Sequence, residues 1–125
     1  MTLMFLTGDG MAGGPLHHQL HGAPLIAVTR TAPEYRFYSV RDRFPALEQV
    51  TEGGYPIAGE VYQVSLAVLR DYLLPAEPAE LELGVIELAG GAAALAMLLR
   101  REFVRPADLV DISAVGDWRA YRPPY

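Results

Sequence analysis

The chain has 125 residues, of which 51% are hydrophobic and 20% are charged, and its net charge is −5 at pH 7. This size and balance predict a single folded domain, residues 1–125, because one core usually needs about 100–150 residues. The sequence contains no cysteine, no lysine and no asparagine. It therefore excludes disulfides, thiolate metal sites, a Schiff-base or P-loop lysine, and N-glycosylation.

Charge and hydropathy also bear on partners and location. An acidic chain repels phosphate backbones, so we expect no nucleic-acid partner. The apolar start has no basic region and ends at Leu6, and the longest other apolar run, residues 92–99, is too short to span a bilayer. We therefore expect no membrane partner and a cytoplasmic protein.

Frequent glycine and proline residues divide the first half of the chain into short segments, which favours strands over long helices. The strands that we expect there are residues 2–7, 25–31, 34–40, 46–51 and 57–64. Residues 8–14 form a glycine-rich loop after the first strand. Residues 15–21 fit a short helix, with Pro15 at its first position and Gly22 past its end.

The second half begins with leucine and tyrosine residues at helical spacing, which predict a helix over residues 65–74. Ser65 is its expected N-cap, and Pro75 and Pro78 are expected to stop it. A strand over residues 81–88 follows.

The next segment, residues 92–101, is ambiguous. Its alanines and leucines favour a helix, whereas the preceding Gly90-Gly91 pair favours the return strand of a hairpin, which is our preferred interpretation. A short helical turn is expected at residues 107–110. Because strands and helices do not alternate regularly, the pattern argues against a doubly wound sheet, and we expect an α+β fold.

The glycine-rich loop matches the dinucleotide-binding pattern G-x-G-x-x-G from Gly8 to Gly13. We reject dinucleotide binding because the segment from Pro15 to Gly22 is too short for a crossover helix. Two interpretations remain: a plain tight turn, or a loop whose N–H groups bind a carboxylate or carbonyl oxygen. The candidate ligand-binding residues are Gly8, Asp9, Gly10, Met11, Gly13, Arg36 and Tyr38.

Several ionisable side chains are candidates for chemistry. Glu60 lies within the clearest strand, where burial would raise its pKa and suit it to general acid or base catalysis, unless its face is solvated. Three further glutamates, Glu77, Glu80 and Glu82, follow the predicted helix in a proline-bounded loop. We expect them to be solvated, although a loop beside a site can lend one of them as a base.

Three histidines form an H-H-x-x-H pattern in which His17 and His21 have the i, i+4 spacing of a metal clamp. The pattern lacks the glutamate of H-E-x-x-H, and no cysteine can supply another ligand. We interpret the histidines as exposed residues of a surface helix and expect neither a metal nor a cofactor.

Several segments together, in chain order, resemble the C-terminal domain of allophanate hydrolase. They are L-T-G-D-G-M-A-G-G-P-L-H-H-Q-L at residues 6–20, T-A-P-E-Y-R-F-Y at 31–38, G-E-V-Y at 59–62, L-G-V-I-E-L at 83–88, D-I-S at 111–113 and G-D-W-R-A-Y at 116–121. The resemblance implies a γ-glutamylcyclotransferase-like fold, which is a small, mostly antiparallel β-barrel with a few short helices. It also implies a ligand pocket shaped by the glycine loop after the first strand.

In that family, an amidase domain carries the serine chemistry and the C-terminal domain processes the N-carboxycarbamate product by decarboxylation. The present chain departs from the family pattern at Gly10, which stands where the family has histidine. Glycine cannot transfer a proton, so the departure puts the reaction in doubt. His17 stands where the family often has asparagine. The match to the cyclotransferase branch is poorer, because Thr7-Gly8 replaces its tyrosine-glycine pair.

Two functional hypotheses follow. In the first, the glycine loop binds a small carboxylate- or amide-bearing metabolite linked to urea and allophanate, Arg36 pairs with an anionic group, and Glu60 acts as the acid or base. A decarboxylase, lyase or cyclotransferase activity would then be open to the site. In the second, the domain is a non-catalytic module that dimerises or docks on a partner amidase, using exposed aromatics and the tail at residues 121–125.

Overall fold

A computed structural model describes residues 2–122 of the chain. The described residues form eight strands: β1 Thr2–Leu6, β2 Leu25–Arg30, β3 Tyr35–Val40, β4 Phe44–Gln49, β5 Ala58–Val64, β6 Leu81–Glu87, β7 Ala93–Leu99 and β8 Leu109–Asp111. The helices are short: η1 His17–Leu20, α1 Leu66–Val68, η2 Leu69–Leu73, α2 Leu74–Ala76, η3 Arg101–Phe103, η4 Pro106–Asp108 and α3 Trp118–Tyr121. No helix in this part of the chain is long and apolar enough to cross a membrane.

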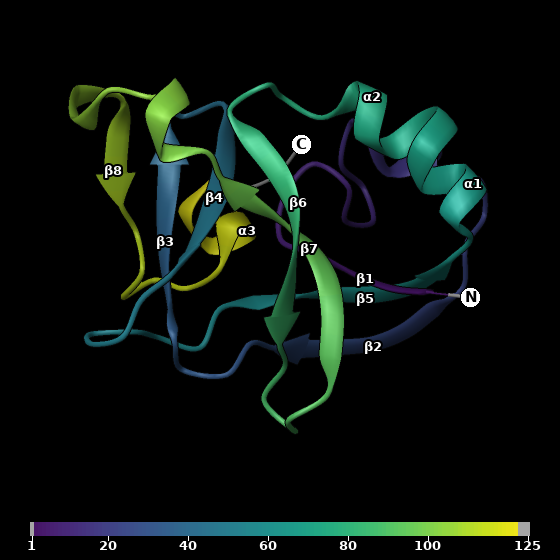
Figure 1. Cartoon of the computed structure of the whole chain (residues 1–125), viewed down its shortest axis with the longest axis horizontal. Helices are drawn as coiled ribbons and strands as arrows, with labels where there is room; N and C mark the ends of the chain where they lie inside the picture. The colour runs from purple at the N-terminus through teal and green to yellow at the C-terminus, as the bar shows by residue number, and fades with distance from the viewer. Residues whose placement is uncertain (1, 123–125) are drawn as a thin grey trace.

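All the strands belong to one sheet, in the order β2-β5-β1-β7-β4-β3-β8, with β6 paired to β7 outside this path. Most pairs are antiparallel, whereas β7 is parallel to both β1 and β4. The sheet curls into a half-barrel (Figure 1). The predicted α+β fold class, with a mostly antiparallel sheet and few short helices, is confirmed.

The core fills the inside of this curled sheet. Met4, Phe5 and Leu6 of β1 are all buried, because β1 lies in the interior of the sheet between β5 and β7. In β3 the alternation is visible, since Tyr35, Phe37 and Ser39 are buried while Arg36 and Tyr38 are partly exposed. Trp118 of α3 closes one side and is only 2% exposed. The C-terminal segment is therefore part of the core.

Local signals account for most of the element boundaries. The Ser65 hydroxyl accepts a hydrogen bond from the Val68 N–H at 3.1 Å, as expected of an N-cap. The ambiguous segment is the return strand β7, fully paired with β6 from Leu81↔Leu99 to Glu87↔Ala93. The hairpin interpretation is therefore confirmed.

Two details differ from the sequence expectation. Pro75 does not stop the helix: the chain is helical without a break from Leu66 to Ala76, and the turn directly before Pro75 is the π turn η2. A π turn replaces the regular i→i−4 hydrogen bonds that a proline interrupts. The helical turn expected at residues 107–110 ends at Asp108, where β8 begins and pairs with β3. The pairing with a buried strand outweighs the local helical preference.

Candidate functional site

The glycine-rich loop after β1 is a compact series of turns. The Met11 N–H donates to the Gly8 carbonyl at 3.0 Å, the Gly14 N–H to the Met11 carbonyl at 2.9 Å, and the Leu16 N–H to the Asp9 carbonyl at 2.9 Å. Gly8 packs directly against β4, since a Cβ there would lie 2.5 Å from Pro45 Cδ. This close approach is possible only for glycine, so the loop is held against β4 where β1 ends.

A cavity of about 30 Å³ opens beside this loop. Its lining combines residues 7–10 of the loop, Phe44 and Pro45 at the start of β4, Glu77 after α2, and Leu81 of β6. A volume of this size holds about two water molecules or one small planar group. It therefore suits the end of a small ligand rather than a large cofactor.

Glu77 is the ionisable group that this cavity perturbs most. Burial raises its pKa from the ordinary 4.5 to about 7, and the negative charge of Asp9 adds to the rise. Among the described residues, no side-chain or backbone donor makes a hydrogen bond to this carboxyl group. A carboxyl group with a pKa near 7 can both hold and release a proton at neutral pH.

The loop brings two buried backbone groups to the same cavity. Gly8 and Gly10 are buried and line it, and within residues 2–122 neither of their N–H groups has a hydrogen-bond acceptor. Buried N–H groups without a partner are rare in folded proteins. These donors are suited to an oxygen atom from water or a ligand.

Glu60, on β5, contacts a different part of the loop. Its Oε1 atom accepts hydrogen bonds from the Ala12 N–H at 2.8 Å and the Tyr62 hydroxyl at 2.7 Å, and Arg119 Nη1 lies 3.2 Å from Oε2. Burial alone would raise the pKa of Glu60, but these hydrogen bonds and the Arg119 charge together lower it. Glu60 is thus ionised at neutral pH and has no proton to give.

The neighbours of Glu60 are fixed by the same contacts. Burial and the bond to Glu60 raise the pKa of Tyr62 to about 12, so its hydroxyl stays protonated and donates. His17 packs edge-on against the Tyr62 ring at 5.5 Å, and its Nδ1 atom lies 3.0 Å from the Gly10 carbonyl oxygen. His17 therefore contacts the loop as a packing and hydrogen-bonding residue.

The other two histidines do not converge with His17. His18 is exposed beside Gln19, and His21 packs against the Tyr72 ring with 3.8 Å between ring centroids. Among the described residues, no group of three His, Cys, Asp or Glu side chains could hold a metal ion.

The structure brings only part of the predicted ligand site together. Gly8, Asp9 and Gly10 line the cavity. Met11 is buried and lies instead near Glu60 and Arg119, in a second, shallower hollow of about 60 Å³. Gly13 turns the chain with φ of 86°.

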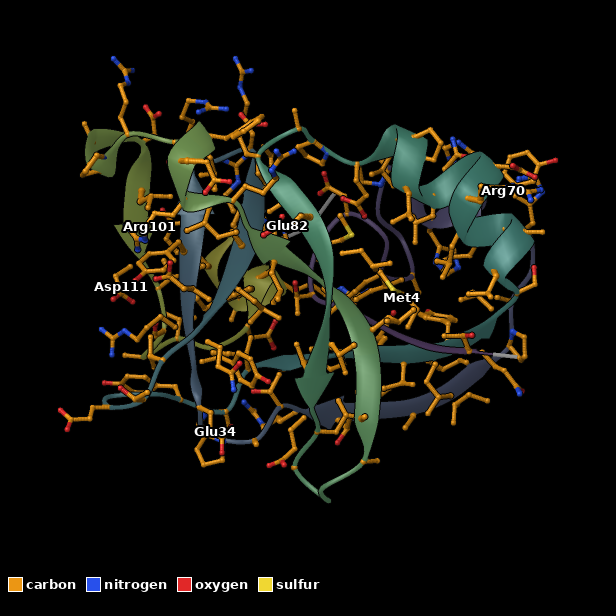
Figure 2. The ribbon with its side chains drawn as sticks, in the orientation of Figure 1. Met4, Glu34, Arg70, Glu82, Arg101 and Asp111 are labelled. Carbon is orange, nitrogen blue, oxygen red and sulfur yellow. The ribbon has the colours of Figure 1, made fainter. Side chains whose placement is uncertain are left out.

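Arg36 and Tyr38 lie away from the loop, on β3. Arg36 pairs with Asp111, with 2.5 Å between Nη2 and Oδ2, and also donates to the Gly53 carbonyl at 2.6 Å. Tyr38 lies near Glu48 and under Arg101. Figure 2 shows Asp111 and Arg101 near β3 and β8, at the end of the molecule opposite Arg70. The structure therefore does not bring Arg36 to the Gly8–Gly10 cavity.

Two site residues emerge that the sequence did not single out. Glu77 was one of three loop glutamates, and only its place in the cavity lining near Asp9 distinguishes it from Glu80 and Glu82. Arg119, in the C-terminal segment, donates to both Glu60 and the Ala12 carbonyl. It is 107 residues from Ala12 in the chain, so no local pattern indicates the contact.

The sequence matches the family model described as the allophanate hydrolase C-terminal domain over residues 2–123. A solved structure of a uropathogenic E. coli-specific protein is 32% identical, covers 99% of this chain and 97% of its own, and superposes with a TM-score of 0.90. No curated protein matches the sequence significantly.

Two further solved structures are similar to this chain at lower sequence identity. Kluyveromyces lactis allophanate hydrolase is 26% identical over 96% of this chain, with a TM-score of 0.87, and the present chain spans 21% of its length. A mouse aig2-like protein is 18% identical over 86% of this chain and 82% of its own, with a TM-score of 0.64, which supports the fold alone.

Proposed function

Because the chain belongs to the allophanate hydrolase C-terminal domain family, we propose that it binds a small carboxylate- or amide-bearing molecule in the cavity between Gly8–Gly10 and Glu77. The observation that carries the proposal is the Glu77 carboxyl group, which has a pKa of about 7 and lines the same small cavity as the buried residues Gly8 and Gly10. A planar carboxyl or amide group has oxygen atoms for the N–H donors and matches the volume of the cavity.

The charge of the cavity narrows the chemistry further. Within residues 2–122, its lining contains the carboxyl groups of Asp9 and Glu77 and no arginine or histidine. An anionic ligand is then bound well only while Glu77 is protonated, because two carboxylates at close range repel each other. Protonated Glu77 can donate a hydrogen bond to the ligand, and anion binding weakens as the pH rises through 7.

This arrangement also suits one reaction, the decarboxylation of N-carboxycarbamate. The Glu77 carboxyl group gives its proton to the substrate nitrogen, one C–N bond breaks with its electron pair moving to nitrogen, and carbon dioxide and carbamate are formed. Glu77 then regains a proton from water. We propose Glu77 for the acid role predicted from sequence for Glu60, since Glu60 stays ionised within three hydrogen bonds.

The proposed link to urea metabolism comes from the relatives, whose names include allophanate hydrolase and urea amidolyase. The present chain spans only 21% and 8% of those two proteins. We propose that an amidase, the activity expected of the remaining part of such proteins, produces the ligand. Gly10 still differs from the family pattern, which has histidine at this position. A Cβ there would lie 3.0 Å from Leu6 Cδ1, so a side chain requires only a small shift of Leu6.

Thermal unfolding with three related probes tests ligand binding. Malonate, malonamate and malonamide have nearly the same shape as N-carboxycarbamate, allophanate and biuret, but they are chemically stable and carry two, one and no negative charges. At pH 6 we expect at least one probe to raise the Tm, because a ligand that binds only the folded state stabilises it. The rise from malonate should shrink at pH 8 more than that from malonamide.

Glu77→Gln tests whether the ionisable carboxyl group controls binding, as distinct from the probe simply filling the cavity. The variant keeps the shape and a donor, so malonamide binding should persist while the pH dependence of malonate binding disappears. Glu82→Gln is the control, because Glu82 lies at the start of β6 outside the cavity lining and its side chain is 57% exposed. If no probe raises the Tm of the wild-type protein at either pH, the proposed site is wrong.

A second candidate function is association with a partner or a second copy. Its support is strand β2, which lies at one edge of the sheet and exposes Leu25, Ile26 and Val28, the last being 74% exposed. Exposed apolar edge strands readily pair with another chain. The tail proposed from sequence for such docking lies partly outside the described residues, at 123–125. Sedimentation of the wild type and of Val28→Glu tests this function. If both proteins sediment as monomers, the association is contradicted.

A further inference from the structure

The backbone of Ala12, in the middle of the glycine loop, is held at both of its polar groups by side chains distant in sequence. Its N–H donates to Glu60 Oε1 at 2.8 Å, and its carbonyl accepts a hydrogen bond from Arg119 Nη2. The two side chains also pair with each other, with 3.2 Å between Arg119 Nη1 and Glu60 Oε2. The contacts form a closed ring of one peptide residue, one carboxylate and one guanidinium.

Glu60 and Arg119 both lie on elements that are held in place by the rest of the fold. Glu60 lies on β5, which pairs with β1 and β2, and its own side chain is 8% exposed. Arg119 lies on α3, where the Asp117 side chain accepts from the Arg119 N–H at 3.0 Å and Trp118 is buried in the core. The Tyr121 hydroxyl fixes the end of α3 to Asp42 at 2.6 Å. These contacts of Ala12 with Glu60 and Arg119, which we call the clamp, therefore connect the loop to a paired strand of the sheet and to a helix anchored in the core.

The loop itself has little else to hold this stretch. Ala12 and Gly13 are exposed, and a Cβ at Gly13 would meet nothing within 4 Å. Upstream, Gly8 and Gly10 line the proposed ligand cavity, and the Met11 N–H bond to the Gly8 carbonyl connects the clamped and ligand-facing halves. A movement at Ala12 would therefore reach the N–H groups of Gly8 and Gly10.

We propose that Arg119 and Glu60 are positioning residues of the ligand site, acting through the Ala12 peptide to hold the Gly8–Gly10 N–H groups in binding geometry. This inference rests on the proposed function, since it assigns the site a support that does not touch the ligand. Preorganised donors bind more tightly because the binding-competent loop is already populated. The C-terminal helix thus becomes part of the site, although it lies outside the cavity.

Amide hydrogen exchange tests the clamp without any ligand. In Arg119→Met we expect exchange at Ala12, Met11 and Gly14 to rise about tenfold, while the amides of β3 and β4 keep their wild-type rates. Arg70→Met is the matched control, because the ion-pair partner of Arg70 within residues 2–122 is its surface neighbour Asp71. Equal acceleration of all amides, or none in the loop, would overturn the clamp.

Malonamate affinity, measured by titration calorimetry at pH 6, tests the consequence for the site. Arg119→Met should weaken binding about tenfold, and Arg119→Lys should recover part of the loss because it keeps one donor to Glu60. Unchanged affinity despite a loosened loop overturns the positioning role and leaves ligand binding intact. If wild-type protein with a protected loop binds none of the three probes, the proposed function fails, and the positioning role fails with it.

Discussion

Glu60 and Glu77 contact different parts of the same glycine loop, and their surroundings push them toward opposite protonation states. Glu60 is surrounded by donors from Ala12, Tyr62 and Arg119, which keep its pKa below the ordinary value despite burial. Glu77 has burial and the nearby Asp9 charge but no donor among the described residues, and its pKa rises to about 7. The number of donors, rather than burial itself, separates an ionised anchor from a group that can exchange a proton.

This difference indicates that Glu60 has a structural role and Glu77 a functional one. A carboxylate with all its oxygen atoms satisfied is a stable connector, and removing it leaves other buried groups without partners. A carboxyl group without donors costs stability whenever it ionises, and such a cost is tolerated at functional sites. Substitutions at the two positions should therefore change stability in opposite directions.

The largest expected effect is loss of stability in Glu60→Ala. The Ala12 N–H and the Tyr62 hydroxyl lose their acceptor and Arg119 loses its partner, which should lower the free energy of unfolding by about 3 kcal/mol. Urea denaturation at pH 7 measures this change. Glu52→Ala, at an exposed position, is the control. A loss of less than about 1 kcal/mol would show that the Glu60 contacts are not the anchor described.

Glu77→Gln should instead raise the free energy of unfolding at pH 8. Because the folded pKa of Glu77 is raised above 4.5, the folded state keeps a proton that the unfolded chain releases. Stability therefore falls as the pH rises from about 4.5 to about 7, and removing the acid should recover about 2 kcal/mol at pH 8. At pH 4 the variant and wild type should be nearly equal. The measurement is urea unfolding across this pH range, and a variant less stable at pH 8 would contradict the assignment.

A smaller effect is expected from Gly8→Ala, which changes the Glu77 side of the loop without changing a charge. The new Cβ would lie 2.5 Å from Pro45 Cδ, so β4 or the loop must move, at a cost of about 1.5 kcal/mol. Malonamate binding should fall with it, because the displaced loop narrows the cavity. Gly90→Ala, where a Cβ meets nothing within 4 Å, is the matched control. Wild-type affinity in Gly8→Ala would place the ligand elsewhere.

The fold was largely predictable because its signals are local. Glycine and proline punctuation indicated the strands, Ser65 caps its helix as its hydroxyl predicts, and the Gly90-Gly91 turn decided between helix and hairpin. The family motifs supplied the arrangement of strands in space. Where local propensity failed, as at Leu109 and Pro75, strand pairing and a π turn explain the outcome.

The candidate site was less predictable because it depends on contacts across the chain. Residue type alone could not decide which glutamate lies among donors and which lies among apolar groups. Glu60 was expected to have a raised pKa from burial, and the opposite shift comes from the donors Ala12 and Tyr62 together with Arg119, which is 59 residues away. Arg36 was assigned to the site by its charge, but its partner Asp111 is provided by β8.

Arg36→Met should therefore have the smallest effect of all. The Arg36–Asp111 pair is partly exposed, with 29% and 39% of the two side chains accessible, and such pairs contribute about 0.5 kcal/mol. Urea unfolding should detect at most this loss, and calorimetry should find the wild-type affinity for malonamate. A marked loss of affinity with unchanged stability would mean that ligands bind on the β3 face. The Glu77 cavity would then not be the binding site, and the contrast between the two glutamates would concern only stability.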